Sequence, residues 1–349
     1  MRLKLYGYFA GNLGDDLMIA LLLRRYPKIR FFCDSWAVET DRFRKFPNFE
    51  NMEALQRKYG RVNHLLNILT GYRREDFFIR RIRESREKAC KGAVYMGGSI
   101  YTPRTPVFRE EDKLKNGPLF VIGASFTGDA AAYRDYFRRC GGVVFRDRAS
   151  IRQFPGLEHI RLAPDVVLNL PAQPAEPDGS VLICVMDFYA REELRPWAEV
   201  YEKRMLDICR ECTKPVLVSF CQKQGDETAL RRIAENLGKP VQTLCYGEDP
   251  TPILEAFARA DRVIATRLHS LVLAVRYGKP VFALAYEEKV SNLASDMGLS
   301  GTCTLPGLET LTGSQILKRC ALPPDREKQI QEASAQFALL DAWLEGENG

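Results

Sequence analysis

Short apolar runs rich in β-branched and aromatic residues alternate with longer amphipathic stretches along the whole of this 349-residue chain. Such alternation is typical of a parallel β-sheet whose strands are joined by crossover helices. The predicted strands of the first half are residues 2–9, 29–34, 93–96, 119–124 and 143–146. Those of the second half are residues 181–186, 215–220, 241–245, 262–266 and 280–285. The predicted fold class is therefore α/β.

A proline-rich segment separates the two sets of strands. Residues 171–180 contain three prolines and a glycine, which exclude a helix and are typical of a linker. A chain of this length also exceeds one comfortable hydrophobic core. We therefore predict two Rossmann-like, doubly wound domains, residues 1–172 and 179–349, with a cleft between them. The second ends in an amphipathic helix within residues 323–344, where apolar residues recur at helical spacing.

The lengths of the apolar runs and the positions of the cysteines indicate the cellular compartment of the protein. The longest apolar run is residues 17–23, far below the roughly 20 residues of a membrane-spanning helix. The first residues, MRLKLYGYFAGN, lack the pattern of an export signal. Ten cysteines show no repeated spacing, and several lie in apolar runs, which is typical of reduced thiols. We expect a cytoplasmic protein without disulfides.

Basic residues are concentrated in one segment. The net charge of +6 is too small to indicate nucleic-acid binding. Residues 73–91, however, hold eight basic and four acidic residues interleaved with Phe77, Phe78, Ile79 and Ile82. One interpretation is a helix that lies on the anionic inner face of a membrane. The other, which the sequence favours, is a solvated helix whose arginine stems cover the protein.

A glycine turn follows the first predicted strand. Residues 11–16 read Gly-Asn-Leu-Gly-Asp-Asp and precede a helix predicted over residues 17–26. Asp15 and Asp16 at a helix N-terminus would repel a phosphate, so this turn is a poor phosphate cradle. Carboxylates beside Gly11, Asn12 and Gly14 suit sugar hydroxyls, which they can bind or deprotonate. The alternative is that Asp15 only caps the helix and the glycines only make the turn.

The strand predicted over residues 262–266 ends in Arg267-Leu-His269, and a helix begins at once. Ligands of open α/β sheets bind beyond the carboxyl ends of strands, where helix N-termini point at them. Arg267 could donate two parallel hydrogen bonds to a phosphate or carboxylate, and His269 could exchange a proton near neutral pH. The alternative is a histidine that caps its own helix and an arginine in a structural ion pair.

Other strand ends supply further candidates. Lys289 is predicted in the first turn of a helix, where a cation is unfavourable unless an anion offsets it. Additional polar or glycine residues at strand ends are Gly97, Gly98, Ser99, Ser125, Arg146, Asp147, Asp165 and residues 222–226. Cys209 and Cys212 form a C-x-x-C pair with no second pair, so we predict no metal site.

These motifs together resemble the polysaccharide pyruvyl transferase family over about residues 5–300. The resemblance is carried by residues 11–16, by Gly-Gly-Ser at 97–99, by Arg-Asp-Arg-Ala-Ser at 146–150, and by residues 265–281. The last block reads Ala-Thr-Arg-Leu-His-Ser-Leu-Val-Leu-Ala and ends in Gly-Lys-Pro-Val. The chain departs from the family at Ser99, where a third glycine is usual, and in the less glycine-rich loop 123–128.

The resemblance implies a fold similar to two-domain GT-B glycosyltransferases. It also implies transfer of a pyruvyl group from phosphoenolpyruvate to a saccharide, usually as a cyclic ketal, in cell-surface polysaccharide biosynthesis. No metal or cofactor is implied. Carried over by motif, Arg267, His269 and Lys289 would form the phosphoenolpyruvate site, with Arg146 reaching across from the other domain. Ser270, next in the same block, and Gly97, Gly98 and Ser99 are placed with the substrate-binding residues.

The proposed chemistry fits these residue types. Phosphoenolpyruvate carries close to three negative charges, so its site needs several cations. His269 is the predicted acid/base, and Asp15 or Asp16 would hold or deprotonate a hydroxyl of a free or lipid-linked saccharide. A nucleotide-sugar glycosyltransferase of the same fold is an alternative, because Glu288 and Asp296 resemble the acidic pair of retaining enzymes. A third alternative is a non-catalytic saccharide-binding relative.

Overall fold

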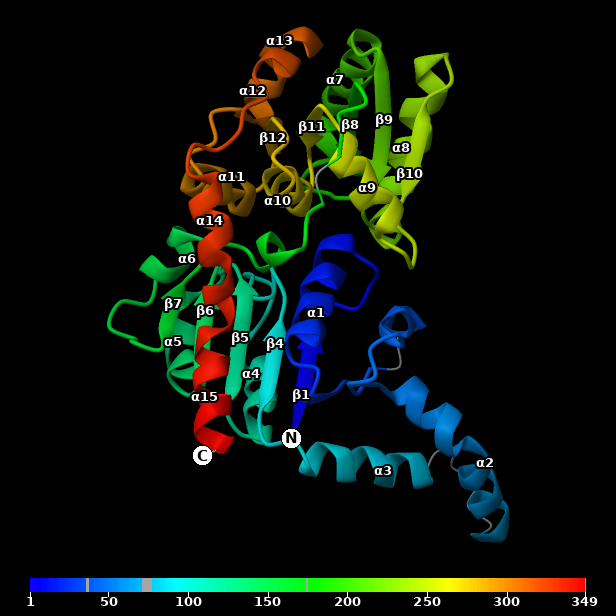
Figure 1. Ribbon diagram of the computed structural model, residues 1–349, viewed down its shortest axis with the longest axis vertical. Helices are drawn as coiled ribbons and strands as arrows, with labels where there is room; N and C mark the ends of the chain where they lie inside the picture. The colour runs from blue at the N-terminus through cyan, green and yellow to red at the C-terminus, as the bar shows by residue number, and fades with distance from the viewer. Residues whose placement is uncertain (36–37, 71–76, 174, 349) are drawn as a thin grey trace.

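The computed structural model describes residues 1–35, 38–70, 77–173 and 175–348, which form two parallel β-sheets flanked by helices (Figure 1). In the N-terminal sheet the strand order is β3-β2-β1-β4-β5-β6-β7. In the C-terminal sheet it is β10-β9-β8-β11-β12-β13. Both orders are doubly wound, because the chain starts at a central strand and builds outward in two directions. The predicted α/β class is confirmed.

The N-terminal strands are β1 (Arg2–Gly7), β2 (Arg30–Phe32), β3 (Phe49–Glu50), β4 (Ala93–Met96), β5 (Leu119–Ala124), β6 (Gly142–Phe145) and β7 (Ile160–Leu162). The helices between them are α1 (Leu13–Arg25), α2 (Met52–Thr70), α3 (Phe77–Lys88), α4 (Val107–Glu111), α5 (Ala130–Arg138) and α6 (Arg148–Arg152). Short 3₁₀ helices are η1 (Val38–Phe43), η2 (Asp112–Asn116) and η3 (Val166–Asn169).

The C-terminal strands are β8 (Ser180–Val185), β9 (Lys214–Ser219), β10 (Gln242–Cys245), β11 (Arg262–Ala265), β12 (Val281–Ala285) and β13 (Thr302–Thr304). Its helices are α7 (Ala198–Glu211), α8 (Asp226–Leu237), α9 (Thr251–Arg259), α10 (Leu268–Arg276), α11 (Glu288–Asp296), α12 (Leu305–Thr310) and α13 (Gly313–Lys318). The chain ends with α14 (Arg326–Glu332) and α15 (Ala338–Asn348). Short 3₁₀ helices are η4 (Arg195–Trp197), η5 (Gln222–Gln224) and η6 (Ala333–Phe337).

Every predicted strand is present, with its ends within two residues of the prediction. The strands that the sequence missed, β3, β7 and β13, are two or three residues long and lie at sheet edges. The prediction for α1 was wrong at its start. This helix begins at Leu13 rather than residue 17, and the side chain of Asn12 caps it by accepting a hydrogen bond from Gly14 N at 3.1 Å. Acidic residues are favourable in a first helical turn, so Asp15 and Asp16 belong inside the helix.

The last helices join the two sheets. Arg326 of α14 donates to the carbonyl oxygen of Val275 in α10 at 2.6 Å, whereas α15 packs on the N-terminal sheet (Figure 1). The rings of Trp343 and Phe120 lie 5.4 Å apart there. Helix α15 therefore covers the N-terminal sheet, although it lies within the range predicted for the C-terminal domain, residues 179–349.

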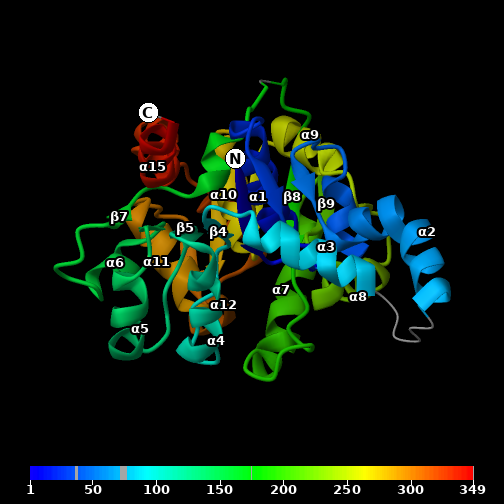
Figure 2. The same cartoon turned by 90° about the horizontal axis from the view of Figure 1, so that it is seen from below.

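Helices α2 and α3 pack against each other beside the N-terminal sheet, and α2 extends away from the body of the molecule (Figures 1 and 2). Within the basic segment 73–91, residues 73–76 lie outside the described residues. Ile79 of α3 is fully buried in a cluster with Met52 and Leu55, and Ile82 packs against it. Phe78, Ile79 and Ile82 of α3 thus face the protein, so these three residues do not form the membrane-facing surface that one interpretation of this segment gave them.

Candidate functional site

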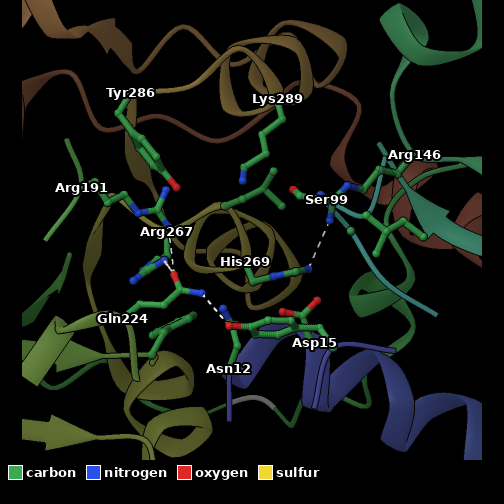
Figure 3. A pocket seen from close by; sticks show the side chains of 15 residues that line it. Asn12, Asp15, Ser99, Arg146, Arg191, Gln224, Arg267, His269, Tyr286 and Lys289 are labelled. Carbon is green, nitrogen blue, oxygen red and sulfur yellow. Dashed lines mark hydrogen bonds between the residues drawn. The ribbon is translucent and has the colours of Figure 1, made fainter. Parts of the chain in front are cut away.

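A cavity of about 210 Å³ opens between the two sheets at the carboxyl ends of their strands (Figure 3). Both domains contribute to its walls. The N-terminal domain supplies Tyr8, Asn12, Asp15, Gly98, Ser99, Ile100 and Arg146. The C-terminal domain supplies Arg191, Phe220, Gln224, Arg267, Leu268, His269, Tyr286 and Lys289. The cavity therefore lies where the sequence analysis expected a ligand, beyond the carboxyl ends of the strands.

Asp15, the third residue of α1, lies at the cavity wall. Burial raises the pKa of its carboxyl to about 6, although Arg146, Lys289 and a hydrogen bond from the backbone of Gly98 act in the opposite direction. A carboxyl with this pKa can exchange a proton close to neutral pH. The structure thus places one of the two predicted aspartates where it can meet a ligand.

His269, the second residue of α10, lies at the centre of the site (Figure 3). Its Nε2 is 3.4 Å from Nη1 of Arg146 and 3.7 Å from Oδ2 of Asp165. A guanidinium only donates, so in a hydrogen bond with Arg146 the Nε2 of His269 is the acceptor. Burial lowers the pKa of His269 to about 4. The imidazole is therefore neutral in the empty site and can accept a proton.

Gly14 makes room for this imidazole. A Cβ atom built on Gly14 would lie 1.8 Å from Nδ1 of His269, so any larger residue in the first turn of α1 must displace the ring. This contact explains why the second glycine of the turn is required. It acts by allowing His269 to approach α1, not by touching a substrate.

Because His269 is the predicted acid/base, we expect Gly14→Ala to lower kcat by about tenfold to 10²-fold, since a ring shifted by about 1 Å loses its alignment. The unfolding midpoint should fall modestly, since overpacking costs about 1–3 kcal/mol. Turnover and urea unfolding of the variant check this. Gly346→Ala is the matched control, because a Cβ there meets nothing within 4 Å. Unchanged turnover of Gly14→Ala would contradict the contact.

Arg146 follows β6 and reaches the site from the N-terminal domain. Its Nη1 donates to Oδ2 of Asp165 and its Nε to Oγ of Ser125, both at 2.9 Å, and Arg146 and Asp165 are buried. A Cβ on Gly98 would lie 2.6 Å from Nη2 of Arg146. Gly98 therefore leaves space for the guanidinium.

Arg267 is held in a buried ion pair. Its Nε donates to Oδ2 of Asp226 at 3.0 Å, its Nη2 contacts Oδ1 of the same carboxylate, and its Nη1 donates to Oε1 of Gln224 at 2.5 Å. Three of the five N–H donors of Arg267 are therefore already bonded to protein groups. The structural ion pair weighed as the alternative is present, and ligand binding by Arg267 stays a prediction.

Lys289 and Arg191 share one carboxylate. Nζ of Lys289 lies 2.7 Å from Oε2 of Glu287, and Nη1 of Arg191 lies 2.7 Å from Oε1. Burial lowers the pKa of Lys289, with Glu287 acting in the opposite direction. Two cations against one carboxylate leave an excess of positive charge at this wall. Lys289 lies in the first turn of α11 as predicted.

The sequence missed Arg191, which lies in the loop after β8 at the same sheet edge. Tyr8 follows β1 in the same way, and its hydroxyl accepts a hydrogen bond from Nε2 of Gln224 across the domains at 3.2 Å. The residues that follow β1 and β8 could have been included among the candidates, because ligands bind beyond the carboxyl ends of strands, and Tyr8 and Arg191 would then have been found. Gln224 and Asp165 were among the weaker candidates.

Several predicted residues do not line the cavity. Oδ2 of Asp16 instead contacts Nη1 of Arg42 at 2.5 Å and the hydroxyl of Tyr246 at 2.8 Å, and burial raises the pKa of Asp16 to about 7. The contact with Tyr246 joins the two domains, and Asp15 is the one of the two aspartates that lines the cavity. Oγ of Ser270 donates to the carbonyl oxygen of Arg267 at 2.5 Å, within its own helix. The remaining predicted residues outside the lining are Gly11, Gly14, Gly97, Ser125, Asp147, Asp165 and, within residues 222–226, all but Gln224.

Among the described residues, no group of three or more histidine, cysteine, aspartate or glutamate side chains is arranged to hold a metal ion. The same residues include no helix both long and apolar enough to cross a membrane. A reaction without metal or cofactor stays a prediction.

Residues 12–288 match the family model described as polysaccharide pyruvyl transferase. The matched range includes Asn12, Asp15, Arg146, Arg191 and His269 of the cavity, and it ends one residue before Lys289. No curated protein sequence matches the chain.

Solved structures with the same architecture are glycosyltransferases of the GT-B fold. TarM is 10% identical, with a TM-score of 0.57 over 99% of this chain and 98% of that one. Alr3699/HepE from Anabaena, in complex with UDP and glucose, is 13% identical, with a TM-score of 0.56 over 99% of both chains. The lipopolysaccharide outer core galactosyltransferase WaaB is 11% identical, with a TM-score of 0.50 over 99% and 100%. The predicted GT-B-like fold is confirmed.

Proposed function

Since the chain belongs to the polysaccharide pyruvyl transferase family, we propose that it transfers a pyruvyl group from phosphoenolpyruvate onto hydroxyls of a saccharide in cell-surface polysaccharide biosynthesis. One observation carries the choice of donor. Arg191 and Lys289 share a single carboxylate at the wall of a small cavity, and Arg146 faces them from the other domain. A compact, highly charged anion suits this arrangement.

The phosphate of the donor binds against Arg191 and Lys289, because these two cations share the carboxylate of Glu287, whereas Arg146 and Arg267 each pair with a carboxylate of their own. Arg146, already paired with Asp165, faces the donor carboxylate. Each charge-assisted hydrogen bond contributes about 1.5–3 kcal/mol. The cavity of about 210 Å³ has room for a three-carbon phosphate.

The chemistry then divides between His269 and Asp15. The donor's negative charge raises the pKa of the His269 imidazole above its value in the empty site, so that Nε2 gains a proton. That proton passes to the methylene carbon of phosphoenolpyruvate, and C2 becomes electrophilic. An acceptor hydroxyl adds its oxygen to C2 and gives its proton to Asp15. Phosphate leaves with the C–O bonding electrons and takes the proton from Asp15. A second hydroxyl then closes the ketal and gives its proton to Nε2 of His269, so both side chains return to their starting states.

Thermal shift and phosphate release test this function. Phosphoenolpyruvate should raise the melting temperature of the protein, whereas UDP and GDP should not. Lys289→Gln and Arg191→Gln should each remove most of that shift. Lys115→Gln, whose side chain is 74% exposed on η2, is the control and should keep it. Phosphate release from phosphoenolpyruvate that depends on an added saccharide completes the test.

Glu288 and Asp296, the acidic pair on which the glycosyltransferase alternative depends, do not support that alternative. Oδ2 of Asp296 accepts a hydrogen bond from the backbone of Arg148 at 2.6 Å, which holds α6 against α11, and Glu288 is exposed. Neither side chain lines the cavity. Stabilisation by UDP or GDP instead of phosphoenolpyruvate would favour this function. Saccharide binding without phosphate release would favour the non-catalytic relative.

The pH dependence should report Asp15. Its pKa is raised to about 6, and a general base must be ionised, so kcat at saturating phosphoenolpyruvate, where the bound donor keeps His269 protonated, should fall as the pH drops through about 6. A loss of about tenfold is expected between about pH 7 and pH 5, with a slope of one proton. The charged groups facing Asp15 are Arg146, Lys289 and Asp165. Asp15→Asn should lose activity, and its remaining activity should no longer fall at acidic pH. If the activity of Asp15→Asn still falls in the same way, the titrating group is not Asp15.

A further inference from the structure

The outer side of α2 presents a row of apolar side chains to solvent. Val62, Leu65 and Ile68 are 47, 56 and 63% exposed. Their spacing of three residues keeps them together on the helix surface. Other exposed large apolar residues, such as Phe108 and Leu322, are scattered through the described chain. A contiguous exposed row of this kind marks an interaction surface.

Basic residues continue the same face toward the start of the helix. Arg57, Lys58 and Arg61 are exposed, and with the apolar row they fall within about 140° of the circumference at 3.6 residues per turn. Arg57 also lies 3.4 Å from Asp41. Arg80 and Arg81, exposed on the neighbouring α3, enlarge the basic area.

The fold itself does not need this face. Helix α2 buries Met52 and Leu55 in the cluster beneath it, and Tyr59 packs edge-on against Phe78 of α3 with ring centroids 6.2 Å apart. Figures 1 and 2 both show α2 at the periphery, directed away from the sheets. The outer face is therefore accessible to a large, flat partner.

We propose that this face of α2 docks the protein on an anionic lipid bilayer. Val62, Leu65 and Ile68 enter the boundary between headgroups and acyl chains, and the basic residues meet the anionic headgroups. Charge favours lipid over a second copy of this chain, because two copies would oppose Arg57, Lys58 and Arg61 with themselves. The proposed membrane contact therefore lies on α2 and not on residues 73–91, where the sequence placed it. Helix α3 contributes only basic residues to it.

Sedimentation of the full-length protein with vesicles tests this docking. The protein should bind vesicles in which about one third of the phosphatidylcholine is replaced by phosphatidylglycerol, and not phosphatidylcholine alone. Binding should weaken with salt, because the screening length falls from about 10 Å at 0.1 M to about 3 Å at 1 M. Leu65→Ser with Ile68→Ser, and separately Lys58→Glu with Arg61→Glu, should each reduce partitioning at least about tenfold.

Phe108→Ser is the matched control, since Phe108 is 66% exposed on α4 and should not contribute. Circular dichroism confirms that the variants fold. No binding of the wild type to anionic vesicles, or binding of both double variants like the wild type, would overturn the proposal. So would a dimer in light scattering that Leu65→Ser with Ile68→Ser abolishes. Phosphate release with a soluble acceptor should be unchanged in the α2 variants, so failure of docking is distinguishable from failure of the proposed function.

Discussion

Replacing His269 by glutamine is expected to lower kcat for pyruvyl transfer by about 10²–10⁴-fold, the contribution of a general acid or base. Glutamine keeps a hydrogen-bonding group beside Arg146 but cannot carry the proton to the methylene carbon. Burial keeps His269 neutral in the empty site, with a pKa of about 4, so a neutral replacement breaks no ion pair at neutral pH. Phosphate release at saturating phosphoenolpyruvate measures the effect.

The matched control is His159→Gln. His159 contacts the carbonyl oxygen of Phe137 at 2.7 Å, outside the cavity, so the same substitution there should leave kcat within a few-fold of wild type. Thermal unfolding of His269→Gln should stay close to that of wild type. Turnover of His269→Gln within a few-fold of wild type would show that another group moves the proton.

Arg267→Met is expected to destabilise the protein by about 3–5 kcal/mol, because Asp226 would keep a buried carboxylate without its cation. Asp226 is fully buried and otherwise accepts hydrogen bonds only from backbone groups, those of Phe220 at 3.2 Å and Cys221 at 3.0 Å, among its described contacts. Urea unfolding measures the loss. Lys289→Met should cost less, since the Lys289 side chain is 18% exposed and leaves Arg191 paired with Glu287.

The double variant Arg267→Met with Asp226→Leu separates stability from donor binding. Removing both charges should recover most of the lost stability, as with other buried pairs replaced by apolar residues. If the double variant also recovers the thermal shift with phosphoenolpyruvate, Arg267 positions the site and does not bind the donor. If stability returns without that shift, Arg267 binds the donor directly. Equal stability losses in Arg267→Met and Lys289→Met would contradict the ion-pair argument.

The location of the site could be predicted because parallel sheets place all their strand ends at one edge. His269 and Lys289 follow β11 and β12, which pair directly, so their proximity is a consequence of strand order alone. Asp15 follows the first strand of the other sheet. Which of Asp15 and Asp16 faces the cavity could not be predicted, because adjacent helical residues point about 100° apart and the start of α1 was misplaced.

The amino-acid pattern by itself determined the α/β class, the division into two sheets and the strand ends at which ligands bind, because these follow from hydrophobic periodicity and from prolines near the linker. Tertiary structure decided the partners of each charge. Arg267 pairs with Asp226 and Arg191 with Glu287, 41 and 96 residues apart, and only packing brings such groups together. The charge left to a ligand depends on those pairings, so the cations that can bind an anion emerge only once the chain is folded.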